Sequence, residues 1–150
     1  MAEMLRDRLI REEGLRLFPY KDSRGNWTIG VGHNIMSDPA MLARIDYYQH
    51  FGINNDYALQ LLDADIASAT ESLLKYCPWV DSLDSVRQDV LIDMTFNMGI
   101  MKLLKFKNTL LLVQYGKYEE ASEHMLKTPW ADEVGLRADH LAEVMKTGVA

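Results

Sequence analysis

The chain has 150 residues, which is enough for one domain with a buried core. Apolar residues make up 48% and charged residues 25%, the balance of a soluble globular protein. No apolar run approaches the roughly 20 residues of a membrane span, so we expect no membrane insertion. The net charge of −6 argues against a nucleic-acid binder, which would carry a basic stripe.

The first expected helix, over Ala2–Glu13, ends with two adjacent glutamates. Leu5, Leu9 and Glu13 follow one another at intervals of four, so they share one helix face. Glu12 lies on a different face and can pair with the arginine four residues earlier. Glu13 is therefore the glutamate expected to point into the interior. Burial disfavours the charged form of a carboxyl, which is what a general acid working near neutral pH requires.

The segment Leu15–Ile35 is expected to form a hairpin or small sheet. Asp22 precedes a turn, and the strand after it alternates. One face is expected to carry Trp27, Ile29 and Val31, and the other Thr28, Gly30 and Gly32. The second face, bare except for one hydroxyl, could border a groove for a polymer such as a carbohydrate. An aspartate at a turn and a threonine on a strand are also ordinary structural choices. The spacing alone does not name a reaction.

The rest of the chain has helical periodicity. A short helix is expected from Ser37-Asp38-Pro39 toward Phe51, and a long one over Asp56–Tyr76, whose inner line is Ala58, Leu62, Ile66, Ala69 and Leu73. Pro78 breaks the long helix, and the next, from Leu83-Asp84, is expected to be the buried centre. Further helices are expected over Leu103–Tyr115, Lys117–Lys127 and Leu136–Lys146.

The methionines, the cysteine and the histidines are expected to have structural roles and to form no metal site. Met94, Met98 and Met101 are expected to fill the core. Cys77, the single cysteine, excludes an internal disulfide and fits a reducing compartment. The histidines are far apart and form no His-Glu-x-x-His motif, so we expect no metal site.

The segment EGLRLFPYKDSRGNWTIGVGH resembles the signature of the T-even-phage type of lysozyme, glycoside hydrolase family 24. That signature is Glu, eight residues, Asp, five residues, Thr, and Glu13, Asp22 and Thr28 fit it without a gap. Residues 81–99 resemble the family's central buried helix, and residues 127–148 resemble its C-terminal helices. The resemblance covers nearly the whole chain.

The resemblance implies a lysozyme-like α+β fold, mostly helical. A small N-terminal sheet lobe (13–56) would be joined by a connecting helix (56–76) to a helical C-terminal lobe (77–150). Residues 1–12 would pack on the C-terminal lobe, within a single lysozyme-like domain.

The resemblance also implies a muramidase that cleaves the β-1,4 bond between N-acetylmuramic acid and N-acetylglucosamine in peptidoglycan, with inversion. This reaction needs no cofactor. Glu13 would be the acid and Asp22 the base on a water that Thr28 helps to hold. Inversion requires carboxyl groups roughly 6.5–9.5 Å apart.

Further site residues follow from the alignment alone. Those at positions where the family lines its sugar groove are Asn34, Phe96, Asn97, Thr109 and His124. Without the alignment, Phe96 would be a core residue and His124 a surface residue. Arg137 aligns with an arginine that reaches the catalytic glutamate, so we expect it to pair with Glu13. His33 and Asp65 align with an ion pair, and His33 by itself is expected to close the hairpin.

The biological role implied is that of a phage or prophage endolysin for host lysis. The segment Met1–Arg11 lacks a signal-peptide core, so we expect the protein to stay in the host cytoplasm. We also expect it to be a monomer. A holin would act indirectly, by opening the membrane toward the periplasm and cell wall. A delivered antibacterial effector, a tail-associated lysozyme, an inactive wall-binding module and a lytic transglycosylase remain alternatives. The acidic charge departs from the basic T-even-phage type, and we expect it to affect association rate and salt dependence.

Overall fold

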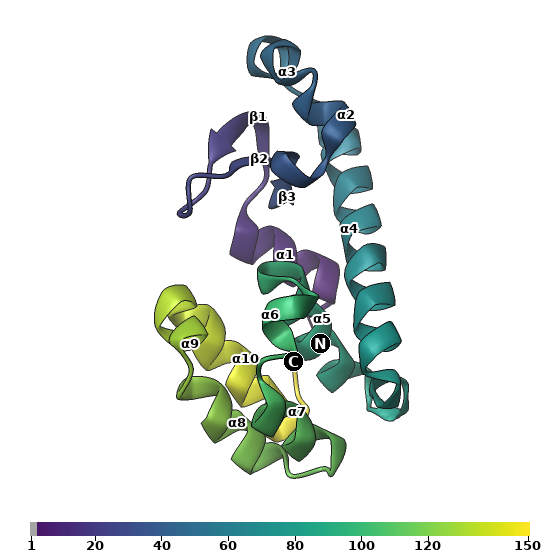
Figure 1. Ribbon diagram of the computed structural model, residues 1–150, viewed down its shortest axis with the longest axis vertical. Helices are drawn as coiled ribbons and strands as arrows, with labels where there is room; N and C mark the ends of the chain where they lie inside the picture. The colour runs from purple at the N-terminus through teal and green to yellow at the C-terminus, as the bar shows by residue number, and fades with distance from the viewer. Residues whose placement is uncertain (1–2) are drawn as a thin grey trace. The chain divides into compact units, whose positions relative to one another are not determined.

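The computed structural model describes residues 3–150, and its fold is the mostly helical α+β arrangement expected from the sequence (Figure 1). The strands are β1 (Arg16–Lys21), β2 (Trp27–Gly30) and β3 (His33–Asn34), and the 3₁₀ helices are η1 (Ile35–Ser37) and η2 (Pro78–Ser82). The α-helices are α1 (Leu5–Glu13), α2 (Pro39–Leu42), α3 (Ile45–Phe51), α4 (Asn55–Tyr76), α5 (Ser85–Met98), α6 (Ile100–Leu103), α7 (Lys107–Gln114), α8 (Tyr118–Leu126), α9 (Pro129–Val134) and α10 (Leu136–Thr147).

The chain divides into two compact units. The N-terminal unit is Leu5–Ala67, and the C-terminal unit is 68–150 together with residues 3 and 4. Helix α4 begins in the first unit and ends in the second. Helix α1 falls in the N-terminal unit, beginning at Leu5, and the packing of residues 1–12 on the C-terminal lobe stays a prediction. Met1 and Ala2 lie outside the described residues.

The N-terminal unit is built on a three-stranded antiparallel sheet in the order β1-β2-β3. The turn expected after Asp22 is present, because the N–H of Gly25 donates to the Asp22 carbonyl at 3.0 Å. Buried beside the sheet are Ile29, Ile35 and Met41. The core of this unit is therefore closed by β2, η1 and α2, which fixes the sheet against local helices.

Of the two helices predicted to begin in this unit, the short one is wrong and the long one is confirmed. The single helix expected from Ser37 toward Phe51 is wrong, because the chain forms α2 and α3 with a break at Ala43 and Arg44. Asp38 caps α2, where its Oδ1 accepts from the N–H of Met41 at 3.2 Å. The long helix is confirmed as α4, and most of its inner line is buried.

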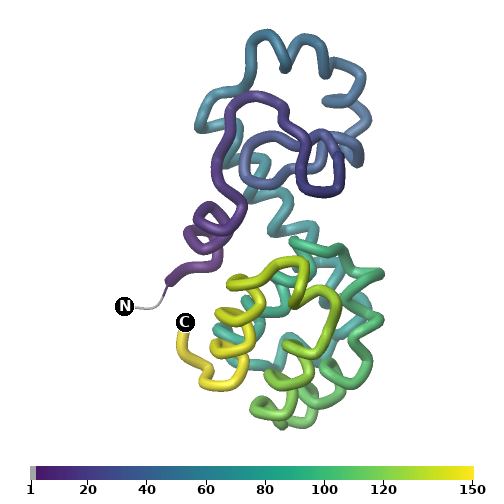
Figure 2. Tube along the Cα trace, turned by 90° about the vertical axis from the view of Figure 1, so that its left-hand side faces the viewer, coloured from purple at the N-terminus to yellow at the C-terminus, as the bar shows by residue number. Residues whose placement is uncertain are grey.

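The C-terminal unit has α5 at its centre, and the run Val90–Thr95 is buried throughout. Helix α8 packs against α7 and α10, and α10 packs against α5 (Figures 1 and 2). Met94 and Met98 are core residues as predicted. Met101 is 58% exposed, so its predicted core role is wrong. It belongs to the short helix α6, which begins after the chain turns at a glycine with φ of 84°.

The predicted helix boundaries fail where the C-terminal unit makes tight connections. The helix expected over Leu103–Tyr115 is present as α7 but begins only at Lys107, because α6 ends at Leu103 and residues 104–106 form a turn. Helix α9 was not expected at all. Its start is nevertheless readable, because the Thr128 side chain accepts from the N–H of Ala131 and Pro129 occupies the first helical position.

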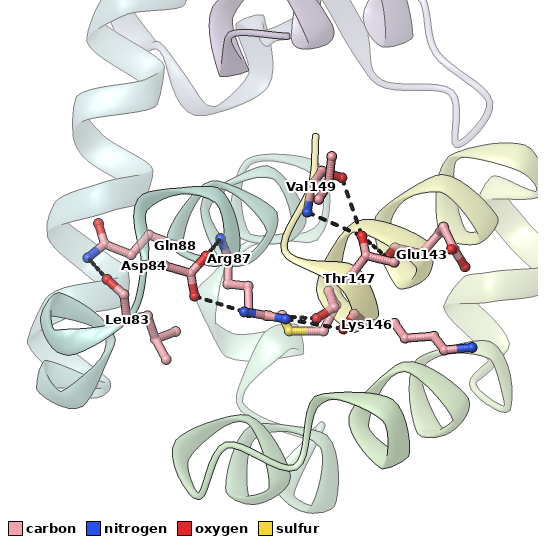
Figure 3. A network of polar contacts seen from close by, with 9 residues as sticks. Leu83, Asp84, Arg87, Gln88, Glu143, Lys146, Thr147 and Val149 are labelled. Carbon is pink, nitrogen blue, oxygen red and sulfur yellow. Dashed lines mark hydrogen bonds and ion pairs between the residues drawn. The ribbon is translucent and has the colours of Figure 1, made fainter. Parts of the chain in front are cut away.

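Arg87 holds the C-terminal end of α10 (Figure 3). Its Nε donates to the carbonyl oxygen of Met145 at 2.7 Å, and its Nη2 donates to that of Lys146 at 3.1 Å. Its Nη1 pairs with Asp84, the N-cap of α5, at 3.1 Å. A helix end leaves carbonyls without intrahelical partners, so one guanidinium ties the end of α10 to the start of α5.

Among residues 3–150, no helix combines the length and the apolar character needed to cross a membrane.

Candidate active site

Glu13 is the last residue of α1, and the backbone of Gly32 lies directly against its carboxyl group. A Cβ placed on Gly32 would stand 3.0 Å from both Cδ and Oε2 of Glu13. Gly32 has a φ of 66°, in the left-handed region that favours glycine. The loop between β2 and β3 therefore holds a half-buried carboxylate by close backbone approach.

Arg8 and Glu12 form the pair expected on α1, but they lie inside the protein. Nε of Arg8 is 3.9 Å from Oε1 of Glu12, and the side chains are only 1% and 4% exposed. The prediction that Glu13 alone of the two glutamates points inward is therefore wrong. Opposite charges that face each other can be buried together at a lower cost than either alone.

Asp22 is fixed by the turn that it opens. Its Oδ1 accepts hydrogen bonds from the N–H groups of Arg24 and Asn26, both at 2.9 Å. Its Oδ2 makes no hydrogen bond within the described part of the chain. One carboxylate oxygen thus sets the orientation of the group, and the other can accept a proton or a hydrogen bond from water.

Thr28 lies on β2 and is buried. Its hydroxyl donates to the carbonyl oxygen of Asn26 at 3.0 Å, so its lone pairs remain available to accept a hydrogen bond from water. The single bare face expected from Thr28, Gly30 and Gly32 is wrong. The strand ends at Gly30, where a Cβ would stand 3.6 Å from Ala58 of α4, whereas Gly32 meets Glu13.

Tyr20 stands among these groups. It is the antiparallel partner of Thr28, so the two side chains share one face of the sheet. Burial raises the pKa of Tyr20, and the charges of Glu13 and Asp22 raise it further against the opposing effect of Arg16. The phenol is therefore neutral at physiological pH and lies within electrostatic reach of both carboxylates.

Comparison with known proteins assigns the chain to a family. The phage lysozyme family model matches residues 10–143, which include Glu13, Asp22 and Thr28. The chain belongs to the phage lysozyme family. Membership of a lysozyme family implies glycoside hydrolase activity.

The relatives of this phage-lysozyme-family chain include two proteins named as lysozymes and one phage spike protein. Two proteins of Dictyostelium discoideum, named probable T4-type lysozymes 1 and 2, are 29% and 27% identical to it. Each alignment covers 99% of this chain and 96% of the relative. The pre-baseplate central spike protein Gp5 of Enterobacteria phage T4 is 31% identical over 99% of this chain, which spans 28% of that protein.

His33 of this lysozyme-family chain lies between two carboxylates. Its Nδ1 is 2.7 Å from Oδ2 of Asp65, as the alignment implied, and its Nε2 is 2.9 Å from Oδ2 of Asp38. Burial alone would lower the pKa of His33, but the hydrogen bonds to Asp65 and Asp38 raise it overall. Burial opposes a lowered pKa at Asp38, yet the hydrogen bonds from His33 and from the N–H of Met41 lower it. The His33 ring thus ties β3, the start of α2 and α4 together.

We expect His33→Asn to lower the free energy of unfolding most between about pH 4 and 6.5, the ordinary pKa values of the two kinds of group. Because the pKa of His33 is raised, the stability that this group contributes is fully present below its unfolded pKa of 6.5 and is lost as pH rises through the folded pKa. Because the pKa of Asp38 is lowered, the stability that this group contributes is present above its unfolded pKa of 3.8 and is lost as pH falls through the folded pKa. With two charged hydrogen bonds removed, the loss should be about 3 kcal/mol.

Urea unfolding of the wild type and His33→Asn at several pH values measures this difference. His50→Asn, at an exposed histidine of α3, is the control. A difference that stays constant from pH 5 to pH 9, or that grows toward pH 9, would show that the charged imidazole is not what stabilises the protein.

The residues expected to line the sugar groove are divided between the two units. Asn34 is exposed in the N-terminal unit and caps η1, its Oδ1 accepting from the N–H of Met36 at 2.9 Å. In the C-terminal unit Thr109 is buried in α7, His124 is exposed on α8, and Phe96 and Asn97 are half-buried on α5. The convergence of these residues on one site stays a prediction.

Arg137 pairs with a carboxylate that the sequence analysis did not single out. Its Nη2 and Nε lie 2.9 and 3.1 Å from Oδ1 of Asp93, whose side chain is 0% exposed. Its expected pairing with Glu13 joins residues of different units and stays a prediction.

The contacts missed by sequence reasoning are Gly32 on Glu13, Asp38 on His33, and Trp130 on Asn97, where Nε1 donates to Oδ1 at 2.8 Å. The glycine before His33 was a usable signal, because a glycine within or beside a strand often marks a place where another group approaches the backbone closely. Nothing local in the sequence indicated the pairing of Trp130 with Asn97.

We expect Gly32→Ala to lower turnover by about 100-fold, because a displacement of roughly 1 Å in a reacting group can have that effect. The added methyl group would meet the Glu13 carboxyl at 3.0 Å, at a φ that L residues rarely adopt. Gly116→Ala is the matched control, since Gly116 has a φ of 76° and nothing within 4 Å of an added Cβ. Initial rates on purified cell walls measure the effect. An equal loss of turnover in both variants would show that backbone strain, and not the contact with Glu13, is the cause.

Proposed function

We propose that this chain is a muramidase that hydrolyses the β-1,4 bond between N-acetylmuramic acid and N-acetylglucosamine in peptidoglycan. Peptidoglycan is thus the proposed substrate. The observation that carries the proposal is the pair of carboxylates on one compact unit, Glu13 on the backbone of Gly32 and Asp22 in its turn, within a lysozyme-family chain. No cofactor takes part.

The proposed reaction is a single displacement with inversion. Glu13 gives its proton to the glycosidic oxygen as the bond to the anomeric carbon breaks. A water on the opposite face of the sugar attacks that carbon, and Asp22 takes the proton of the water through Oδ2, the oxygen not engaged by the turn. Thr28 accepts a hydrogen bond from the same water. Solvent then returns a proton to Glu13 and removes one from Asp22.

The proposed activity is tested on outer-membrane-stripped Gram-negative cells and on purified cell walls. We expect the wild type to clear the cells and to release muropeptides that end in reducing N-acetylmuramic acid, identified by mass. Anhydro-sugar ends would instead indicate a lytic transglycosylase, which does not need Asp22 as a base on water. A folded protein that clears nothing would overturn the enzyme proposal in favour of an inactive wall-binding module.

For the biological role we propose an endolysin, a monomer held in the host cytoplasm until a holin opens the membrane to the periplasm. The family match to phage lysozymes supports this role. A tail-associated or otherwise delivered lysozyme is the second candidate, because the matching spike protein carries a similar segment as 28% of its length. Removing the gene from its phage or prophage separates the two roles. Loss of release with normal adsorption indicates an endolysin, and loss of entry indicates a tail component.

A further inference from the structure

Trp130 and Asn97 make a hydrogen bond whose direction is fixed by chemistry. Nε1 of Trp130 lies 2.8 Å from Oδ1 of Asn97, between the first turn of α9 and the last turn of α5. An indole nitrogen can only donate, so the amide must turn its oxygen toward the ring. Trp130 is 5% exposed, and a buried N–H without an acceptor is costly.

The consequence is an amide group that can act only as a donor toward anything else. With Oδ1 engaged by the indole, the two N–H bonds of Nδ2 point away from Trp130. Within residues 3–150, Nδ2 makes no hydrogen bond, and Asn97 is only half-buried. The ring of Phe106 packs edge-on against Trp130, with centroids 6.1 Å apart, and so restricts the indole. A fixed, unused donor pair on a half-buried side chain is suited to a ligand that offers an acceptor.

We propose that Trp130 is a positioning residue that makes Asn97 a donor for the carbonyl oxygen of an N-acetyl group. The inference rests on the proposed function, in which every sugar of the substrate carries such a group. An amide carbonyl only accepts, so it requires the donor face of Asn97. A sugar hydroxyl both donates and accepts, so it could pair with either face of a free amide. Trp130 therefore sets selectivity for N-acetylated glycan, beyond contributing to packing.

The test uses Glu13→Gln, in which cleavage is slowed, as the background. The ligand is a peptide-free tetrasaccharide of peptidoglycan, in N-acetylated and de-N-acetylated forms. Calorimetry gives the dissociation constant of each form. We expect the N-acetylated form to bind about tenfold more tightly, as one net hydrogen bond would give. Adding Trp130→Phe keeps the ring but frees the amide to rotate. The preference should then fall to about twofold, because the rotated amide offers its oxygen to the ammonium group of the de-N-acetylated form.

Two controls separate positioning from packing. Trp79→Phe makes the same substitution in η2 of the same unit and should leave the preference unchanged. Trp130→Phe with Asn97→Leu removes the amide without leaving an indole N–H unpaired, and should lower the preference at least as far as Trp130→Phe alone. In ¹H–¹⁵N spectra, the N-acetylated ligand should shift the Asn97 side-chain amide signals and the Trp130 indole signal.

Each outcome decides between these ideas. A Trp130→Phe variant that weakens both ligands by the same factor, or neither, would overturn the positioning role and leave the proposed function standing. Failure of the Glu13→Gln background to bind either form would overturn the proposed function, and the inference with it.

Discussion

Glu13→Gln should lower the turnover of peptidoglycan by about 10²–10⁴-fold, the range that general acid catalysis contributes. The amide has nearly the shape of the carboxyl group, so its contact with the backbone of Gly32 is kept. It cannot give up a proton to the glycosidic oxygen. Binding of the substrate should therefore change little, whereas the rate of bond cleavage falls. Initial rates on purified cell walls, at equal concentrations of folded protein, measure the effect.

Asp7→Asn is the control for Glu13→Gln, because Asp7 is an exposed carboxylate on the same helix and its loss changes the net charge equally. It should keep the wild-type rate. If Glu13→Gln retained more than a tenth of the wild-type turnover, or if Asp7→Asn lost as much, the role of Glu13 as the acid would be wrong.

Arg137→Leu should lower the free energy of unfolding by about 3–5 kcal/mol, the cost of breaking a buried ion pair by removing one partner. The guanidinium makes contacts of 2.9 and 3.1 Å with Oδ1 of Asp93, which is fully buried on α5. Without it, a buried carboxylate loses the cation that offsets its desolvation. Urea unfolding at neutral pH measures the loss and does not depend on activity.

Two further variants serve as controls for Arg137→Leu. Arg6→Leu breaks an exposed pair with Asp63 at 3.0 Å, and it should cost no more than about 1 kcal/mol. Adding Asp93→Asn to Arg137→Leu removes the buried charge and should restore part of the lost stability. A loss in Arg137→Leu no larger than that in Arg6→Leu would show that the buried pair does not stabilise the C-terminal unit.

What the sequence predicted well depends on neighbours in the chain. The end of α1 at Glu13, the turn at Asp22 and the strand with Thr28 follow from periodicity, a glycine and a turn signal within some 20 residues of one another. The caps of α2 and α5 were readable for the same reason, because Asp38 and Asp84 each accept from an N–H three residues ahead.

What the sequence could not predict depends on pairs that only folding brings together. Trp130 meets Asn97 across 33 residues, and Arg137 meets Asp93 across 44. Arg8 carries a charge, so the periodicity of apolar residues could not place it in the core. Helix α9 is only six residues long, too short for a periodic pattern, and was readable only from its cap.

The most direct test of the account is the configuration of the first sugar released. Proton NMR of a soluble peptidoglycan glycan, followed from the first turnovers, reports the anomeric form, and mass spectrometry of the products formed in H₂¹⁸O reports the source of the new oxygen. A reaction with Glu13 as acid and Asp22 as base on water predicts the α-anomer of reducing N-acetylmuramic acid, carrying ¹⁸O, before mutarotation. The β-anomer as first product would contradict the direct displacement, and an anhydro-sugar without ¹⁸O would contradict hydrolysis itself.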